Sequence, residues 1–166
     1  MGCDIHAYIE YKHWGDKWWP FANLDIDRDY QLFGLMAGVR RSDIDPVAQP
    51  RGVPSDASWK VNDENELFVS DDPSGGREKP YVSKADAARW LNQGISQQGH
   101  SESYITDPDW HTHSWLTIPE LRQVIKRYED GCEQDAPNEV RATLASMLML
   151  CGEDEENARL VFWFDN

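Results

Sequence analysis

Apolar and polar residues alternate without interruption over residues 3–12. The odd positions are apolar and the even positions are polar: Cys3, Ile5, Ala7 and Ile9 against Asp4, His6, Tyr8 and Glu10. A period of two predicts a β-strand with one buried face and one polar face. Gly15-Asp16 then predicts a hairpin turn into a returning strand at Lys17-Trp18-Trp19, which Pro20 keeps short or places at a sheet edge.

Apolar residues at helical spacing follow in four later segments, at about 30–39, 83–94, 117–131 and 137–152. The first segment comes after the acidic run at residues 25–29, which complements the positive end of a helix dipole. The third has the strongest start signal, because Thr117 and Glu120 form a capping-box pattern around Pro119. The continuous apolar run at residues 160–164 is typical of a buried strand.

These elements predict an α+β fold. We expect a small mixed or antiparallel sheet, built from the N-terminal hairpin and the C-terminal strand and covered by about four helices. The length of 166 residues suits a single domain over 1–166. Residues from about 40 to 80 predict an irregular excursion, either a binding loop or a surface insertion. Its markers are Pro46, Pro50, Pro54, Pro73 and Gly75-Gly76.

Composition and charge exclude several classes of protein. Sixteen basic residues against thirty acidic ones give a net charge of −14, which repels phosphates at long range and argues against a reader of DNA grooves. The same charge suits either a basic partner protein or simple solubility. Three scattered cysteines without a C-x-x-C motif argue against a disulfide framework and a zinc ribbon. Without an apolar run of membrane-spanning or signal-peptide character, we expect a cytoplasmic protein with no membrane partner.

Two short stretches repeat one spacing of metal-ligating side chains. Asp4 and His6 are two residues apart on the polar face of the first strand, and His111 and His113 have the same spacing. Brought together, they would offer three imidazoles and a carboxylate, a set suited to a divalent metal such as zinc or manganese. We therefore predict Asp4, His6, His111 and His113 as metal ligands, with Asp4, His6 and His113 as the catalytic residues. A metal-free acid–base cluster and purely structural histidines remain open alternatives.

Ligand contacts are predicted beside this set. Ser114 and Trp115 follow His113 directly, Tyr8 shares the polar face of the first strand, and Arg51 lies in the irregular segment. An arginine fork binds phosphate, and any of the eight tryptophans offers a face on which a base can stack. The arginines near the irregular segment, Arg40, Arg41 and Arg51, have two alternative roles: they can cap a helix or pair with nearby aspartates such as Asp43 and Asp45.

Several blocks of the chain together resemble one family. They are MGCDIHAYIEY at the start, DRDYQLFGLMAGVR ending at Arg40, PRGVP at 50–54, HTHSWLT at 111–117 and VFWFDN at 161–166. This set resembles a group of small bacteriophage and prophage proteins of uncharacterised activity that begin with MGCDIH. The resemblance implies action in the cytoplasm of an infected bacterium. It also implies that Asp4, His6, His113, Ser114 and Trp115 lie in the blocks that define the group.

Two classes of function follow. In the first, a metal-dependent hydrolase acts on a phosphate- or nucleotide-containing ligand at the Asp/His site. In the second, a non-catalytic counter-defence or host-takeover protein sequesters a nucleotide signal, or presents its acidic surface to a host protein. The sequence therefore leaves open whether the protein is an enzyme.

Overall fold

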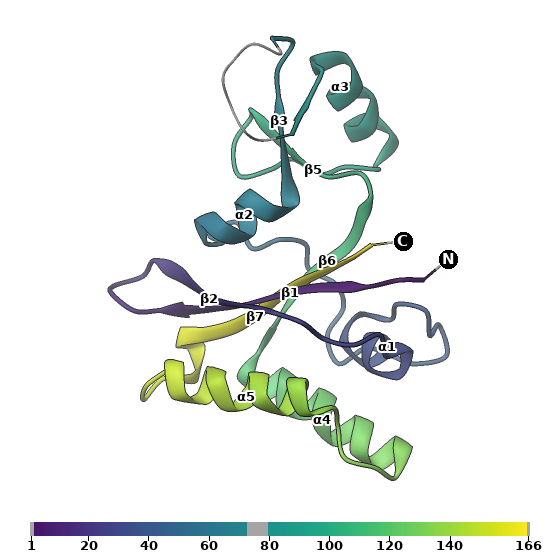
Figure 1. Ribbon diagram of the computed structural model, residues 1–166, viewed down its shortest axis with the longest axis vertical. Coiled ribbons are helices and arrows are strands. Elements are labelled where there is room, and N and C mark those ends of the chain that lie inside the picture. The colour runs from purple at the N-terminus through teal and green to yellow at the C-terminus, as the bar shows by residue number, and fades with distance from the viewer. Residues whose placement is uncertain (1, 73–79, 166) are drawn as a thin grey trace. The chain divides into compact units, whose positions relative to one another are not determined.

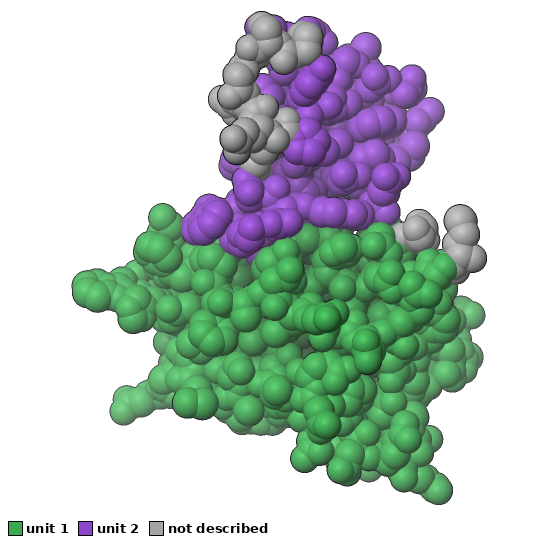
Figure 2. All heavy atoms as spheres, viewed as in Figure 1, with its two compact units in different colours: residues 1–58, 111–166 green, residues 59–110 purple. Residues whose placement is uncertain are grey.

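The computed structural model describes residues 2–72 and 80–165 and shows a mixed α+β fold, which confirms the predicted class (Figure 1). Chain contacts divide it into two compact units (Figure 2). Unit 1 comprises residues 1–58 and 111–166, and unit 2 comprises residues 59–110. The expectation of a single domain stays a prediction. None of the helices in the described ranges is long and apolar enough to cross a bilayer.

Unit 1 is built on a four-stranded sheet with the order β2-β1-β7-β6. The strands are β1 (Ile5–Lys12), β2 (Trp18–Leu24), β6 (Trp110–Thr117) and β7 (Ala158–Asp165). Strand β1 pairs antiparallel with both β2 and β7. The predicted N-terminal hairpin and the C-terminal strand beside it are therefore confirmed.

Three helices cover one face of this sheet (Figure 1): α1 (Tyr30–Ala37), α4 (Ile118–Cys132) and α5 (Asn138–Leu150). The apolar side chains of β1 point into this core, opposite those of β7: Ile5, Ala7 and Ile9 pair with Phe164, Phe162 and Leu160. Alternation along a strand places the polar residues of β1 on the other face of the sheet.

Local capping explains where these helices begin. The Asp29 side chain accepts hydrogen bonds from the backbone N–H groups of Gln31 and Leu32, so the last residue of the acidic run caps α1. At α4, Thr117 and Glu120 form the predicted capping box. The short 3-10 turn η1 (Glu155–Asn157) lies between α5 and β7 in the chain.

Unit 2 contains α2 (Trp59–Asn65), β3 (Glu66–Val69), β4 (Tyr81–Val82), α3 (Lys84–Gln93) and β5 (Tyr104–Thr106). Its sheet has the order β4-β3-β5, in which β3 pairs parallel with β4 and antiparallel with β5. The core is small: Val82, Ala87 and Ile105. The segment at about 40–80 was predicted to be irregular, but it contains helix α2 and strand β3. Its part at 73–79 lies outside the described residues.

Candidate functional site

The face of the unit 1 sheet that points away from the helices carries most of the predicted site residues. In the β1–β7 register, His6 lies opposite Trp163, Tyr8 opposite Val161, and Glu10 opposite Arg159. Strand β7 therefore supplies an aromatic and a cationic neighbour to the polar face of β1. Because β7 also lies between β1 and β6, it separates the two predicted histidine pairs.

Trp163 is the meeting point of three predicted residues. Its indole stacks with the His6 ring at 5.9 Å, the Tyr8 ring at 5.5 Å and the His113 ring at 5.8 Å between centroids. The N-terminal strand and the later histidine segment thus converge on the same residue. The two imidazoles, however, lie on either side of an indole and do not face a shared open centre.

Asp4 has a different partner from the one predicted. Its carboxylate pairs with Arg28 at 2.6 Å. The carboxylate near His6 is that of Asp165, whose Oδ2 lies 3.0 Å from His6 Nε2 and whose Oδ1 accepts the Asp4 backbone N–H. Burial acts to raise the pKa of Asp165, but these two hydrogen bonds outweigh burial and hold that pKa below its usual value.

His111 and His113 are expected on one strand face, but the backbone changes direction between them. Thr112 has a φ of 53°, in the left-handed region. The His111 ring stacks on Phe164, with centroids 6.1 Å apart, and its Nδ1 lies 2.7 Å from the Thr112 hydroxyl. Since Phe164 and Trp163 are consecutive in β7, their side chains point to opposite faces of the sheet. The two histidines therefore stack on different faces.

His113 is deeply buried, with 5% of its surface exposed. Burial lowers its pKa to about 4, and the neighbouring His111 contributes in the same direction. Its Nε2 has no hydrogen-bond partner within the described part of the chain. At neutral pH His113 is an uncharged imidazole.

The predicted metal set is not gathered around one point. Across residues 2–72 and 80–165, no three His, Cys, Asp or Glu side chains are placed to share an ion. Asp4 is paired with Arg28, and the three histidines are distributed over Asp165, Phe164 and Trp163. A zinc or manganese site at Asp4, His6, His111 and His113 stays a prediction that this placement does not support.

Three of the four predicted ligand contacts meet elsewhere in unit 1. The Arg51 guanidinium carbon lies 3.7 Å from the centre of the Trp115 ring, and the Arg51 backbone N–H donates to the Ser114 hydroxyl at 3.2 Å. Ser114 is fully buried, so it positions the Arg51 segment and does not face a ligand. Tyr8, the fourth predicted contact, is buried against Trp163.

Arg51 also pairs with a carboxylate. It contacts Glu120 at 2.7 Å and donates to the backbone carbonyl of Trp115. Burial acts to raise the pKa of Glu120, but the hydrogen bonds from Arg51 and Thr117 outweigh burial and lower it. The alternative of pairing with a nearby aspartate applies to Arg41, which binds Asp43 at 2.8 Å.

Two cavities of unit 1 share Trp115 and Arg159 in their linings. The first has a volume of about 520 Å³ and is lined by Arg51, Val53, Pro54, Ser55, Asp56, Trp115 and Arg159. The second has a volume of about 240 Å³ and is lined by Lys12, Trp18, Trp115, Thr117, Glu156, Ala158 and Arg159. We call the two together the tryptophan groove.

An ion-pair network that the sequence analysis missed connects the tryptophan groove to β1. Its Glu10–Arg159 pair is buried, whereas its third member, Asp56, is exposed. Arg159 binds Glu10 at 2.7 Å and Asp56 at 2.8 Å, and Glu10 also accepts the Ser58 backbone N–H at 2.6 Å. The Trp18 indole N–H donates to Asp56 at 2.9 Å. These bonds tie the segment that follows Arg51 to the sheet. The available signal was Glu10 itself, a charged residue on the polar face of a strand that needs a cation if it is buried.

The accessible positive charge of the tryptophan groove comes from Arg51 and Lys12. Arg159 is almost fully buried and is neutralised by two carboxylates, whereas Arg51 is partly exposed and has one. Lys12 lies 5.1 Å over the Trp18 ring and makes no ion pair within the described residues. The lining also includes the carboxylates of Asp56 and Glu156, so the groove places cations and anions together against indole faces.

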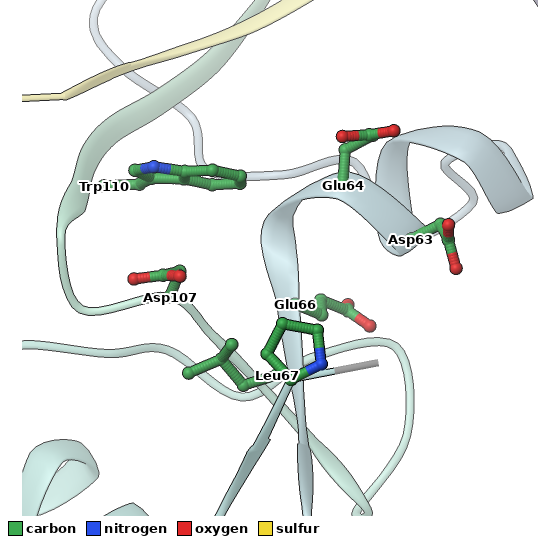
Figure 3. Close-up of a pocket in the computed structure, with 7 residues that line it drawn as sticks. Asp63, Glu64, Glu66, Leu67, Asp107 and Trp110 are labelled. Atoms are coloured by element: carbon green, nitrogen blue, oxygen red, sulfur yellow. The ribbon is translucent and has the colours of Figure 1, made fainter. Parts of the chain in front are cut away.

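Unit 2 has a cavity of about 530 Å³ with the opposite electrostatic character (Figure 3). Its lining is Asp63, Glu64, Glu66, Leu67, Pro80, Asp107 and Trp110. Glu66 is already committed to His100, whose backbone N–H and ring nitrogen both contact its carboxylate. Four carboxylates repel a phosphate, so this cavity is a poor match for the anionic ligand predicted from the sequence.

Comparison of the chain with protein-family models, with curated proteins and with solved structures gives no match in any of the three.

Proposed function

We propose that the protein binds a phosphate-bearing nucleotide in the tryptophan groove and retains it without chemical change. One observation carries the proposal: cations and indoles alternate across the groove. Their order is Arg51, Trp115, Arg159, Trp18 and Lys12, with cation-to-ring distances of 3.7, 5.9, 3.9 and 5.1 Å along the series.

This alternation suits a ligand that is planar at one end and anionic at the other. A guanidinium over an indole presents its outer face to a base, and the N–H groups of Arg51 that Glu120 and the Trp115 carbonyl do not occupy remain for a phosphate. Arg51 is held in this way by Trp115 and Glu120, so little side-chain freedom remains to be lost on binding. Lys12 adds a point charge at the other end of the groove.

The lining of the groove favours retention over turnover. No histidine lines either cavity in the part of the chain that the structure describes. Asp56 is held by Arg159 and Trp18, which lower its pKa despite the opposing effect of burial. A carboxylate bound in this way is a weak general base. His6 and His113, the predicted catalytic residues, pack against Trp163 outside the groove lining.

The proposal places the protein in the cytoplasm of an infected bacterium, as a counter-defence or host-takeover factor that sequesters a nucleotide. This setting rests on the resemblance of its sequence blocks to phage proteins. Its three cysteines, all free thiols, are consistent with a reducing compartment.

Calorimetric titration with a panel of nucleoside mono- and triphosphates tests the proposal. We expect binding to the wild type, and a loss of about tenfold in affinity for Lys12→Gln and Arg51→Gln, because each removes a charge-assisted contact. Lys84→Gln, an exposed lysine of unit 2, is the matched control. After denaturation the bound nucleotide should be recovered intact. A hydrolysed product, or the absence of binding to every member of the panel, would contradict the proposal.

A further inference from the structure

The hairpin that ends the tryptophan groove continues beyond it. Lys12 and Trp18, which line the groove, are cross-strand partners at the turn end of the β1–β2 pairing. Close to them in sequence, three large aromatic side chains are exposed: Trp14 at 74%, Trp19 at 39% and Phe21 at 53%. Aromatic surface gathered on one hairpin and left uncovered is a common mark of a binding surface.

The arrangement of cation and indole found in the groove recurs on this hairpin. Lys17 lies 5.3 Å over the Trp19 ring. His13 and Trp14 have ring centroids 5.5 Å apart, and Phe21 meets Tyr11 edge to face at 6.3 Å. From Tyr11 to Trp19 the chain carries two lysines and one aspartate, so this stretch is cationic within a strongly acidic protein.

We infer that the ligand of the tryptophan groove is a single-stranded oligonucleotide that extends from the groove across β2 onto the exposed aromatics of the hairpin. This inference rests on the proposed function. Bases stack on indole faces whatever their sequence, and lysines and arginines beside those faces track the phosphates. Lys17 stands beside the exposed Trp19 and can serve one such unit. Trp18 is only 6% exposed, so Lys12 and Arg51 contribute contacts to the phosphates and not to a stacked base at Trp18.

The position of β2 makes the crossing from groove to hairpin feasible. Trp18 and Trp19 are consecutive, so they point to opposite faces of the strand. Strand β2 is at the edge of its sheet and pairs only with β1 among the described strands. A flexible single strand can pass over such an edge from Lys12 on the groove side to the exposed Trp19, and Pro20 marks the edge as one that no further strand extends.

The same features argue against a duplex. Indole faces are accessible only to unstacked bases, which a double helix does not offer. A net charge of −14 also opposes the broad phosphate contact that a duplex requires. With three cations near the path, the logarithm of the affinity should fall with the logarithm of the salt concentration with a slope of about −2.

Fluorescence anisotropy with 5′-labelled decathymidylate, in competition with thymidine monophosphate, tests the inference. We expect the oligonucleotide to bind at least about tenfold more tightly than the mononucleotide, because additional bases stack on the hairpin. Trp19→Ala and Lys17→Gln should each weaken the oligonucleotide about tenfold and leave the mononucleotide unchanged. Trp59→Ala, an exposed tryptophan of unit 2, and Lys84→Gln are the matched controls.

The outcomes separate the two proposals. Equal affinity for both ligands, or an oligonucleotide affinity that Trp19→Ala and Lys17→Gln both leave unchanged, overturns the inference while the groove proposal stands. Binding of neither ligand overturns the groove proposal and the inference together. If the Trp19→Ala protein does not fold, Lys17→Gln alone tests the inference, because this substitution removes only an exposed charge.

Discussion

Trp163 occupies the position between β1 and β6 at which a shared imidazole site would need open space. Its indole is fully buried and touches His6, Tyr8 and His113. Flat rings on neighbouring strands stack favourably, so this arrangement stabilises the sheet by packing. The histidines of the predicted site therefore have a structural explanation that requires no ligand.

The buried His113 makes stability depend on pH. Its pKa is about 4 in the folded protein and near 6.5 in the unfolded chain, so the unfolded state binds the additional proton between these values. Stability is present in full above pH 6.5 and falls as the pH drops toward 4, with a contribution of about 3 kcal/mol. Urea denaturation at several pH values measures it.

The control for this prediction is a histidine that is not buried. His113→Gln should flatten the pH dependence between 6.5 and 4, whereas His13→Gln, an exposed residue, should leave it as in the wild type. An unchanged slope in His113→Gln would show that other groups cause the acid sensitivity.

Glu10 and Arg159 form a buried ion pair, and Arg159 lines the tryptophan groove. Both are buried, and removing Glu10 leaves the buried Arg159 with only the exposed carboxylate of Asp56 as its ion-pair partner. We expect Glu10→Ala to lower the free energy of unfolding by about 3 kcal/mol in urea denaturation. Glu153→Ala, at an exposed position, should change it little. A double variant with methionine at both positions should be more stable than Glu10→Ala, and the opposite order would contradict the role of the pair.

Among the elements, α4 connects the groove to the helical layer. Glu120 belongs to its capping box and also binds Arg51. Thr117→Ala removes the cap hydroxyl and should lower the free energy of unfolding by about 1 kcal/mol, as measured by urea denaturation. Thr117→Ser keeps the hydroxyl and should stay close to the wild type. Equal losses in both variants would assign the effect to the methyl group of Thr117.

The sequence was sufficient for the elements that carry local signals. The alternation of β1, the capping box of α4 and the apolar run of β7 can each be recognised within a few consecutive residues. Helix α2 and strand β3 lie in the stretch that its prolines and glycines predict to be irregular, and strands β4 and β5 are too short to give a periodic pattern. The placement of β7 between β1 and β6 depends on tertiary packing, which no local sequence pattern indicates.

The candidate site was predictable to the same limited extent. The sequence predicts Arg51, Ser114 and Trp115 as ligand contacts, and the three residues do meet in unit 1. Arg159 and Trp18 were not, because their contribution depends on the register of β1 with β7 and on the position of the Arg51 segment. The His/Asp spacing was present, but the intervening strand separated its members.

On the scale of the whole molecule, metal binding requires ligands that separate elements bring to one point. The described residues show no such group. We expect the protein, purified without added metal, to contain zinc and manganese in amounts well below one ion per chain, as measured by mass spectrometry of the digested protein. A full equivalent of metal that is lost in both His6→Ala and His113→Ala would contradict this expectation and restore the hydrolase hypothesis.

The central place of β7 has a consequence for how unit 1 is made. Strand β7 is the only sheet neighbour of β6 and the second neighbour of β1 among the described strands. Its residues are synthesised some 150 positions after those of β1, as the pairing of Ile5 with Phe164 illustrates. Until they leave the ribosome, β6 has no strand beside it, whereas every element of unit 2 has already been translated. The second unit can therefore assemble during synthesis, but the sheet that forms the tryptophan groove must wait for its middle strand.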